Sequence, residues 1–519
     1  MPRKALYKDE AFQKLKQGAY KLAHATVETL GPLGKNVVIE SGGIPLVTKD
    51  GVSVARHFDL EDPVERMGAS LVRQAASKTN ENVGDGTTTA TLLACSIIDA
   101  CEGQLSRKWY QFWKEKKDVY QLVKEMREYA DQVSNHLTSQ SVPCETLEML
   151  THVATISANN DPETGKLVAE IVHKIGKEGV VTVEESSGTQ TETEHVEGTQ
   201  LPNGFASPYM ATNDKGECVL TDVHVLVTDR RISTIADMMP VLKALHEAKI
   251  NKLVIVAEEV EGDALATLVV NKVQGVFTSL AVKAPLYGTF RSESLKDLAA
   301  LMGAVFISDE AGRKLDSVKI EDLGHVKKVI STKDKTTFIG GKSDKAQVEA
   351  RIKELRQDIK DEPSTFDREK KSERLARLTS GVALIRVGGY TESEMKEKKY
   401  LIEDAVCATK AALEDGILPG GGSALLLASQ TVPESFISDC LEAPIKAISK
   451  NPSVCHEVKK MLGYNQNAGY DAKTGSYSID LIASGIVDPT KVVKNTLQNA
   501  VSVASTFLTT SCVLYDEKK

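Results

Sequence analysis

The sequence lacks the features of a membrane or secreted protein. No stretch approaches 18 consecutive apolar residues, and residues 1–8 contain no apolar core of a secretory signal. The net charge of -8 supplies neither an overall basic field for nucleic acid nor a polybasic tail for a lipid surface. We therefore expect a cytoplasmic protein whose principal partners are neither nucleic acids nor membranes.

Paired metal ligands are absent as well. The eight cysteines include no Cys-x-x-Cys pair, and the ten histidines avoid the spacing of metal ligands. This pattern excludes a zinc ribbon and argues against a disulfide scaffold or a histidine-based site. We expect most of the cysteines to be core thiols.

The length and the hydrophobic pattern predict several domains. A chain of 519 residues is too long for one hydrophobic core, and about three domains are expected. Both ends show helical spacing, whereas the middle alternates between strands and helices. The predicted strands of the middle region are 220–228, 252–257, 278–283 and 304–308, and its helices are 234–248, 262–274 and 293–302. The charge-rich run 342–377 is interpreted as a solvated helical hairpin.

The N-terminal part has its own predicted elements. Its helices are 9–29, 63–80 and 87–103, and a hairpin of strands 36–39 and 44–48 ends at the turn Lys49-Asp50-Gly51. Residues 104–119 contain both tryptophans of the chain among basic residues. Aromatics between cations can stack on nucleic acid bases, but an amphipathic helix that packs or makes a subunit contact is favoured in an acidic protein.

One polar loop indicates phosphate chemistry. Gly84-Asp85-Gly86-Thr87-Thr88-Thr89-Ala90-Thr91 joins two helical segments, so its glycines allow close backbone approach and its threonines open a helix. Asp85 would repel a bare phosphate, but it would suit Mg2+ that itself binds phosphates. The alternative is a simple Asp-Gly turn with a threonine cap.

A second group of candidates follows the long helix predicted over 391–414. Asp404 lies just off its apolar stripe, and the glycines of 420–422 open another helix, which is a second candidate anion or ribose contact. Each of these motifs is weak alone, and an isolated helical aspartate is usually solvated.

In this order, the motifs make the chain resemble the group I chaperonins, the family of bacterial GroEL. The segments that carry the resemblance are 29–32, 48–55, 84–91, 155–159, 261–271, 395–399, 420–422 and 488–492. The resemblance implies a multidomain α and α/β subunit: a mostly helical equatorial domain (1–139 and 415–519), a small α+β intermediate domain (140–197 and 382–414) and an α/β apical domain (198–381).

The resemblance also implies an ATP site with Mg2+ and K+. Asp404 would orient the attacking water with help from Asp50, Asp85 would hold Mg2+, and Lys49 and Thr88 would lie near the phosphates and K+. The complete nucleotide-binding set would be Thr29, Leu30, Gly31, Pro32, Lys49, Asp85, Gly86, Thr87, Thr88, Thr89, Gly421, Asp471, Ala472 and Asp488.

The expected function is ATP-dependent capture and folding of non-native proteins in a homo-oligomeric, heptameric ring or rings. A co-chaperonin is a further expected partner whose need is left open. The client-binding positions would be Phe205, Tyr209, Met210, Met239, Leu242, Leu265, Val269 and Val270, and the hinges Gly198 and Gly381. The alternatives are a ring-forming holdase or scaffold with weak ATPase activity, and a soluble small-molecule phosphotransferase, which lacks support because no P-loop or kinase motif occurs.

The sequence departs from this family at four places. The end of the chain lacks Gly-Gly-Met repeats, residues 104–119 replace a plainer turn, and the loop at 450–453 is shortened. The last two lie where the family makes ring-to-ring contacts, so a single ring or an altered ring interface is a hypothesis. Asp471 stands where the family usually has asparagine; it keeps an acceptor for the adenine amino group, so ATP preference is expected to survive.

Overall fold

The computed structural model describes residues 3–41, 44–105, 118–177, 179–186, 188–213, 216–310, 312–433 and 435–516. The chain divides into two compact units. Unit 1 comprises Met1–Lys177, Glu185–Gln190 and Val387–Lys519, and unit 2 comprises Glu178–Glu184 and Thr191–Arg386. The chain thus leaves unit 1, forms unit 2 and returns to unit 1. The finer division into three domains stays a prediction.

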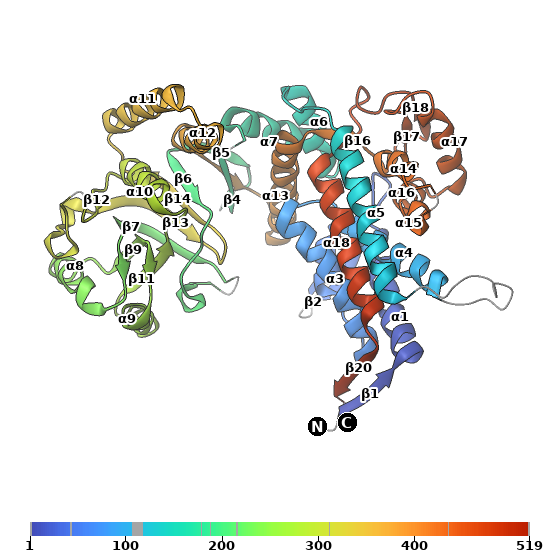
Figure 1. Cartoon of the computed structure of the whole chain (residues 1–519), viewed down its shortest axis with the longest axis horizontal. Helices are drawn as coiled ribbons and strands as arrows, with labels where there is room; N and C mark the ends of the chain where they lie inside the picture. Colours follow the sequence, from blue (N-terminus) through green and yellow to red (C-terminus); the bar gives the residue numbers. More distant parts are fainter. Residues whose placement is uncertain are drawn as a thin grey trace. The chain divides into compact units, whose positions relative to one another are not determined.

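Unit 1 is mostly helical (Figure 1). Its helices are α1 (Lys8–Val27), α2 (Gly51–His57), α3 (Pro63–Val83), α4 (Thr87–Leu105), α5 (Val119–Ser139), α6 (Leu147–Ser157), α7 (Pro162–Ile175), α13 (Glu392–Asp415), α14 (Ser423–Ser429), α15 (Phe436–Cys440), α16 (Ala443–Ser449), α17 (Pro452–Leu462) and α18 (Thr490–Thr509). Its strands are β1 (Arg3–Tyr7), β2 (Val37–Ser41), β3 (Ile44–Thr48), β16 (Ile417–Pro419), β17 (Gly469–Asp471), β18 (Ser476–Ser478), β19 (Val487–Pro489) and β20 (Cys512–Asp516).

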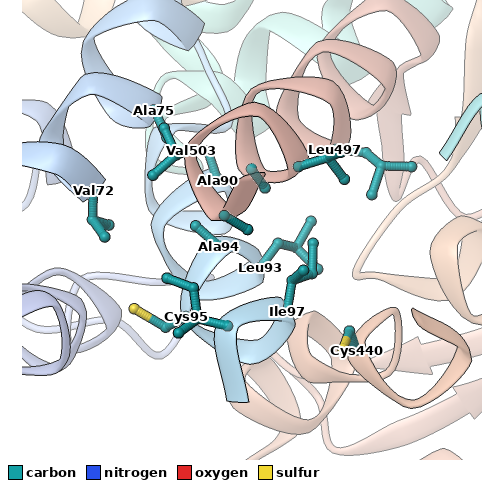
Figure 2. Close-up of a cluster of buried hydrophobic side chains, with 14 of the residues drawn as sticks. Val72, Ala75, Ala90, Leu93, Ala94, Cys95, Ile97, Cys440, Leu497 and Val503 are labelled. Atoms are coloured by element: carbon teal, nitrogen blue, oxygen red, sulfur yellow. The ribbon is translucent and has the colours of Figure 1, made fainter. Parts of the chain in front are cut away.

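The core of unit 1 joins helices from both ends of the sequence. Helix α18 packs against α3 and α4, and α1 packs against α3. Figure 2 shows side chains of α3, α4 and α18 meeting in this core, among them Val72, Leu93 and Leu497. Helix α4 is apolar on nearly all sides, which is typical of a helix buried within its domain. The packing therefore holds the first turn of α4, and with it the polar loop, in a fixed place.

Short strands tie the ends of unit 1 together. Strand β1 pairs antiparallel with β20 (Figure 1), so that Arg3 lies opposite Asp516. Strands β2 and β3 form the predicted antiparallel pair. Residues 42 and 43, which connect them, lie outside the described residues, as do 106–117 of the tryptophan-rich segment. The interpretations of that segment therefore stay predictions.

Unit 2 is built around one mixed sheet. Its strands are β4 (Val180–Glu185), β5 (Glu192–Val196), β6 (Gly198–Leu201), β7 (Cys218–Thr228), β8 (Arg231–Ile232), β9 (Lys252–Ala257), β10 (Glu259–Val260), β11 (Thr278–Lys283), β12 (Phe306–Ile307), β13 (Gly324–Ser331), β14 (Thr336–Gly341) and β15 (Val382–Val387). Its α-helices are α8 (Ile235–Glu247), α9 (Gly262–Val273), α10 (Gly288–Met302), α11 (Lys345–Asp361) and α12 (Thr365–Ser380), and short 3-10 turns lie at Pro208–Met210, Leu315–Ser317 and Ile320–Asp322.

The main sheet has the strand order β11-β9-β7-β13-β14-β6, with β12 also paired to β7. Strands β11, β9 and β7 run parallel, and the pairs β7–β13, β13–β14 and β14–β6 are antiparallel. The parallel strand β9 is apolar and almost entirely buried, as expected for a strand covered on both faces. A second, three-stranded sheet has the order β4-β15-β5.

Two features of the chain differ from the sequence-based expectation. The elements predicted from the sequence omit strands β5, β6, β13 and β14. The presumed turn after β3 is instead the start of α2, because the Asp50 carboxylate accepts hydrogen bonds from the backbone N–H groups of Val52 and Ser53. Asp50 is therefore an N-cap residue whose side chain has a fixed orientation.

The charge-rich hairpin α11–α12 is only partly solvated. Arg374 is 5% exposed, and its guanidinium donates from Nε to Asp297 of α10 at 2.7 Å. Arg351 of α11 donates to the other oxygen of Asp297 at 2.8 Å and also pairs with Glu293. The predicted helical hairpin is thus present, and in addition its arginines bind it to α10 through a buried ion network.

Candidate functional site

A cavity of about 650 Å³ opens in unit 1. It contains every position that the resemblance assigned to nucleotide binding or catalysis, namely Thr29, Leu30, Gly31, Pro32, Lys49, Asp50, Asp85, Gly86, Thr87, Thr88, Thr89, Asp404, Gly421, Asp471, Ala472 and Asp488. These residues come from segments up to several hundred positions apart. The fold therefore brings them to one place, although their individual roles stay predictions.

The polar loop forms one wall of the cavity. Helix α3 ends at Gly84, which has a φ of 72° and so adopts the left-handed conformation, and α4 begins at Thr87. The N–H groups in the first turn of a helix have no partner within that helix, and they lie at the positive end of its dipole. Because Thr87, Thr88 and Thr89 line the cavity at this point, the wall is suited to bind an anion.

Asp85 is held in place at the same wall. One carboxylate oxygen accepts a hydrogen bond from the Gly86 N–H at 2.5 Å, and the other accepts one from the Ser157 hydroxyl at 2.7 Å. Each oxygen keeps a further lone pair for a cation. Asp50, fixed by its capping bonds, lines the cavity as well.

Asp404 reaches the cavity because α13 approaches the loop closely. A β-carbon placed on Gly84 would lie 2.3 Å from the Cβ of Cys407, so the glycine is required for this approach. Asp404 lies three residues before Cys407 and therefore on the same side of α13. Burial raises the pKa of Asp404 well above its ordinary value, and the negative charges of Asp50 and Asp85 raise it further.

The electrostatics of the cavity favour a cation. Three carboxylates lie near one another there, yet the described residues contain no ready-made cluster of three metal-ligating side chains. Such a set fits Mg2+, which is commonly bound by one or two carboxylates together with phosphate oxygens and water. Burial also lowers the pKa of Lys49, the cation that lines this region.

Asp488 occupies the part of the cavity formed by β19. Its strand pairs with β16, so that Leu418 lies opposite Asp488. Burial raises the pKa of Asp488 to about 7, with a smaller contribution from the charge of Asp85. At neutral pH this carboxyl group therefore exists in both protonation states and can either donate or accept a hydrogen bond.

Gly421 and Asp471 form another wall of the cavity. A β-carbon on Gly421 would lie 3.5 Å from the Tyr470 carbonyl oxygen, which places the glycine loop beside β17. The Asp471 carboxylate accepts hydrogen bonds from the Lys473 N–H at 2.8 Å and from the Thr474 hydroxyl at 2.7 Å. It is thus oriented by its own turn. Because Oδ1 also accepts a hydrogen bond from the Thr474 N–H at 3.4 Å, Oδ2 is the oxygen that retains acceptor capacity.

Sequence reasoning missed a third wall of the cavity. Helix α6 and the turn before β19 contribute Thr151, His152, Thr155, Ile156, Ser157, Ser484, Gly485 and Ile486. Residues 155–159 formed one of the family-like segments, but no cavity role was assigned to them. The resemblance of residues 155–159 to the family was the only signal for this wall in the sequence. A helix face of Thr, Ser and Ile carries no charge or spacing that indicates a binding site.

Comparisons with known proteins identify the family of the chain. The model of the TCP-1/cpn60 chaperonin family matches residues 22–518. The chain belongs to the TCP-1/cpn60 chaperonin family. Among solved structures, the chaperonin gp146 from the bacteriophage EL 2 (Pseudomonas aeruginosa), crystallised in the presence of ATP-BeFx, is similar in fold. One crystal form gives a TM-score of 0.73 at 21% identity and a second gives 0.65 at 22%, each over 99% of both chains.

This chain is therefore a divergent chaperonin, and the predicted fold class is confirmed. Membership in this family removes the support for a soluble phosphotransferase. Within the described ranges, no helix of the chaperonin is long and apolar enough to cross a membrane.

The predicted client-binding residues of the chaperonin fall into three groups by exposure. Tyr209, Met239 and Val270 are exposed in unit 2, whereas Phe205, Leu242, Leu265 and Val269 are half-buried against its core. Met210 is fully buried, and its sulfur accepts a hydrogen bond from the Ala281 N–H, so its placement on the exposed surface is wrong. Val273 and Val276 are strongly exposed at the end of α9 and were not predicted.

The predicted hinge glycines also lie in unit 2. Gly381 has a φ of 67° between α12 and β15, which favours glycine at that position. Gly198 instead belongs to β6 and lies opposite Ile339. Their role as hinges stays a prediction.

Proposed function

We propose that this chaperonin binds ATP with Mg2+ in the cavity of unit 1 and hydrolyses it. The observation that carries the proposal is the convergence of the threonine-rich helix start, Asp85, Asp50 and Asp404 on one cavity. Anion-binding N–H groups, a metal-binding carboxylate and a second carboxylate that can orient water are the parts that phosphoryl transfer requires. The ATP-BeFx present with the similar phage chaperonin supports the same ligand class.

The residues would divide the work as follows. The first turn of α4 would bind the phosphates, and Asp85 would hold Mg2+, which neutralises phosphate charge when bound. Lys49 and Thr88 would lie near the phosphates and a K+ ion. Asp404 would orient the attacking water as an ionised carboxylate. A bound cation would favour that ionised form, because it would offset the burial and the acidic neighbours that raise the pKa of Asp404.

We further propose that unit 2 captures non-native proteins on the exposed side chains of α8 and α9. Exposed apolar residues such as Val270 and Val273 are 51% and 72% accessible, and contiguous exposure of this kind marks a binding surface. The same surface would serve a co-chaperonin, and the subunits would form a homo-oligomeric, heptameric ring. The number of rings is best decided by electron microscopy of the purified chain with and without ATP.

The sharpest test of the hydrolytic role is Asp404→Ala. We expect ATP binding, measured by calorimetry, to be retained, while the turnover of ATP falls at least about 100-fold, because the water-orienting group is removed. Glu397→Ala is the matched control, since Glu397 is an exposed acid on the same helix. Unchanged turnover in Asp404→Ala would contradict the assignment.

A further inference from the structure

Helix α6 runs along the cavity between its two ends. At its C-terminus, Ser157 donates a hydrogen bond to Asp85 at the phosphate and metal end. His152 lies five residues earlier in the same helix and also lines the cavity. A rise of 1.5 Å per residue separates these positions by roughly 7.5 Å along the helix axis. His152 therefore lies well away from the wall that binds phosphate.

The imidazole of His152 lies flat against Gly485. A β-carbon on Gly485 would lie 3.0 Å from Cδ2, 3.0 Å from Cγ and 3.1 Å from Cε1 of the ring. Nearly equal distances to three ring atoms place this point over the ring face. Gly485 has a φ of 75° and no side chain, so it both permits the turn and leaves room for the imidazole.

The surroundings of His152 are suited to a planar aromatic group. Ile156 follows one helical turn later and lines the same cavity, and Ile486 directly follows Gly485. The Gly420 N–H donates to the Ile486 carbonyl at 2.9 Å, which joins this wall to the glycine loop beside Tyr470. Apolar walls with a few fixed polar groups are typical of a site for a heteroaromatic ligand.

We propose that His152 contacts the nucleobase of the bound nucleoside triphosphate and so determines part of the affinity for the nucleoside. The inference rests on the proposed ATP binding. The ring nitrogens lie at the edge of the imidazole, and they have no hydrogen-bond partner among the described residues. A neutral imidazole offers one donor and one acceptor, and the edge of adenine carries both an amino donor and a ring-nitrogen acceptor.

Two ligands separate contacts to the base from contacts to the phosphates: Mg-ATP and Mg-tripolyphosphate, which has no base. In His152→Ala we expect the Kd for Mg-ATP, measured by calorimetry on the full chain, to rise about 3- to 10-fold, the effect of one hydrogen bond. The Kd for Mg-tripolyphosphate is expected to stay within about twofold. Glu148→Ala, at an exposed position of the same helix, is the control and is expected to change neither value.

A second variant distinguishes the polar contact from simple packing. His152→Phe keeps a flat ring on Gly485 but removes both nitrogens, so it is expected to lose as much Mg-ATP affinity as His152→Ala. Wild-type affinity in either variant, or an equal loss for both ligands, would overturn the proposal. If the wild-type chain bound tripolyphosphate and ATP with equal affinity, the base would contribute nothing to binding, and the proposed contact with His152 would be excluded. If it bound neither, the proposed function itself would fail.

Discussion

The two units bury acidic side chains in opposite ways. In unit 2, Asp297 is almost fully buried, but Arg351 and Arg374 both donate to it. In the cavity of unit 1, Asp404 has acidic neighbours instead, and the positive charge of Arg56 offsets them only in part. A buried carboxylate with paired arginines holds helices together, whereas one that faces other carboxylates reduces stability until a cation binds. The difference indicates which acids are structural and which belong to a binding site.

The pKa values follow the same division. Burial opposes ionisation of Glu293 in unit 2, but hydrogen bonds from Lys296 and Arg351 outweigh it and lower its pKa to about 2. In unit 1, burial and the neighbouring Asp85 raise the pKa of Asp488 to about 7. The ligand-binding features also differ in exposure, because unit 1 encloses its candidate site and unit 2 displays apolar side chains.

The largest effect is expected from Arg374→Met in unit 2. Methionine fills most of the space but leaves the Asp297 carboxylate with Arg351 as its arginine partner. Removing one member of a buried ion pair typically costs 3–5 kcal/mol, and we expect about 3 kcal/mol because Arg351 remains. The measurement is the local opening free energy of α10, α11 and α12 from hydrogen exchange.

The control for this network is Glu354→Ala. Glu354 is 58% exposed at the side chain and pairs with Arg351 at 2.7 Å. An exposed ion pair contributes less than about 1 kcal/mol, so the change should be small. Equal losses in Glu354→Ala and Arg374→Met would show that burial does not separate the two kinds of ion pair.

An intermediate, pH-dependent effect is expected from Asp488→Asn. The folded pKa of Asp488 lies above that of an unfolded aspartate, so the folded state binds the proton more tightly. The contribution of Asp488 to the stability of the nucleotide-free protein is therefore greatest near pH 4 and is lost as pH rises to about 7. In thermal unfolding measured between pH 5 and 7.5, the stability of Asp488→Asn relative to the wild type should increase as the pH rises. If the stability of both proteins changed equally with pH, Asp488 would not be the source of the pH dependence.

The smallest effect on the folded chain is expected from Val270→Ser with Val273→Ser. Both side chains are more than half exposed, so stability should change by less than about 0.5 kcal/mol. Capture of a chemically unfolded protein, measured by suppression of its aggregation, should weaken while basal ATP turnover stays unchanged. The half-buried Leu242 and Val269 are less suitable targets, because their replacement would also disturb the core. Full capture by the double variant would place client binding elsewhere.

The sequence predicted the long helices and the buried strands well, because their apolar periodicity is strong. It missed β5, whose residues Glu192–Val196 are largely exposed and therefore carry no apolar alternation. It also missed the Asp297–Arg374 pair, since partners 77 positions apart leave no local pattern. Along the sequence, a charged helix with one buried arginine shows the same spacing of charged and apolar residues as a helix that is fully solvated.

The candidate site was predictable only as a set of motifs. Glycines and threonines at the start of α4 indicated an anion site locally, but Asp404 acquired a role only from the resemblance to the chaperonins. The burial of Met210 and the position of His152 on Gly485 depend on tertiary packing, which no spacing in the sequence reports. The structure thus corrected one client-binding residue and added the third wall of the cavity.

The pairing of β1 with β20 has a consequence for synthesis on the ribosome. Strand β1 precedes unit 2 in the chain, whereas its partner and helix α18 follow unit 2, so unit 1 cannot complete its core until all of unit 2 has been translated. Unit 2 lies almost entirely within Thr191–Arg386, and its sheet can assemble earlier. The nascent chain therefore exposes the unfinished core of unit 1 while unit 2 is being made, and this folding assistant would itself need protection from aggregation during that time.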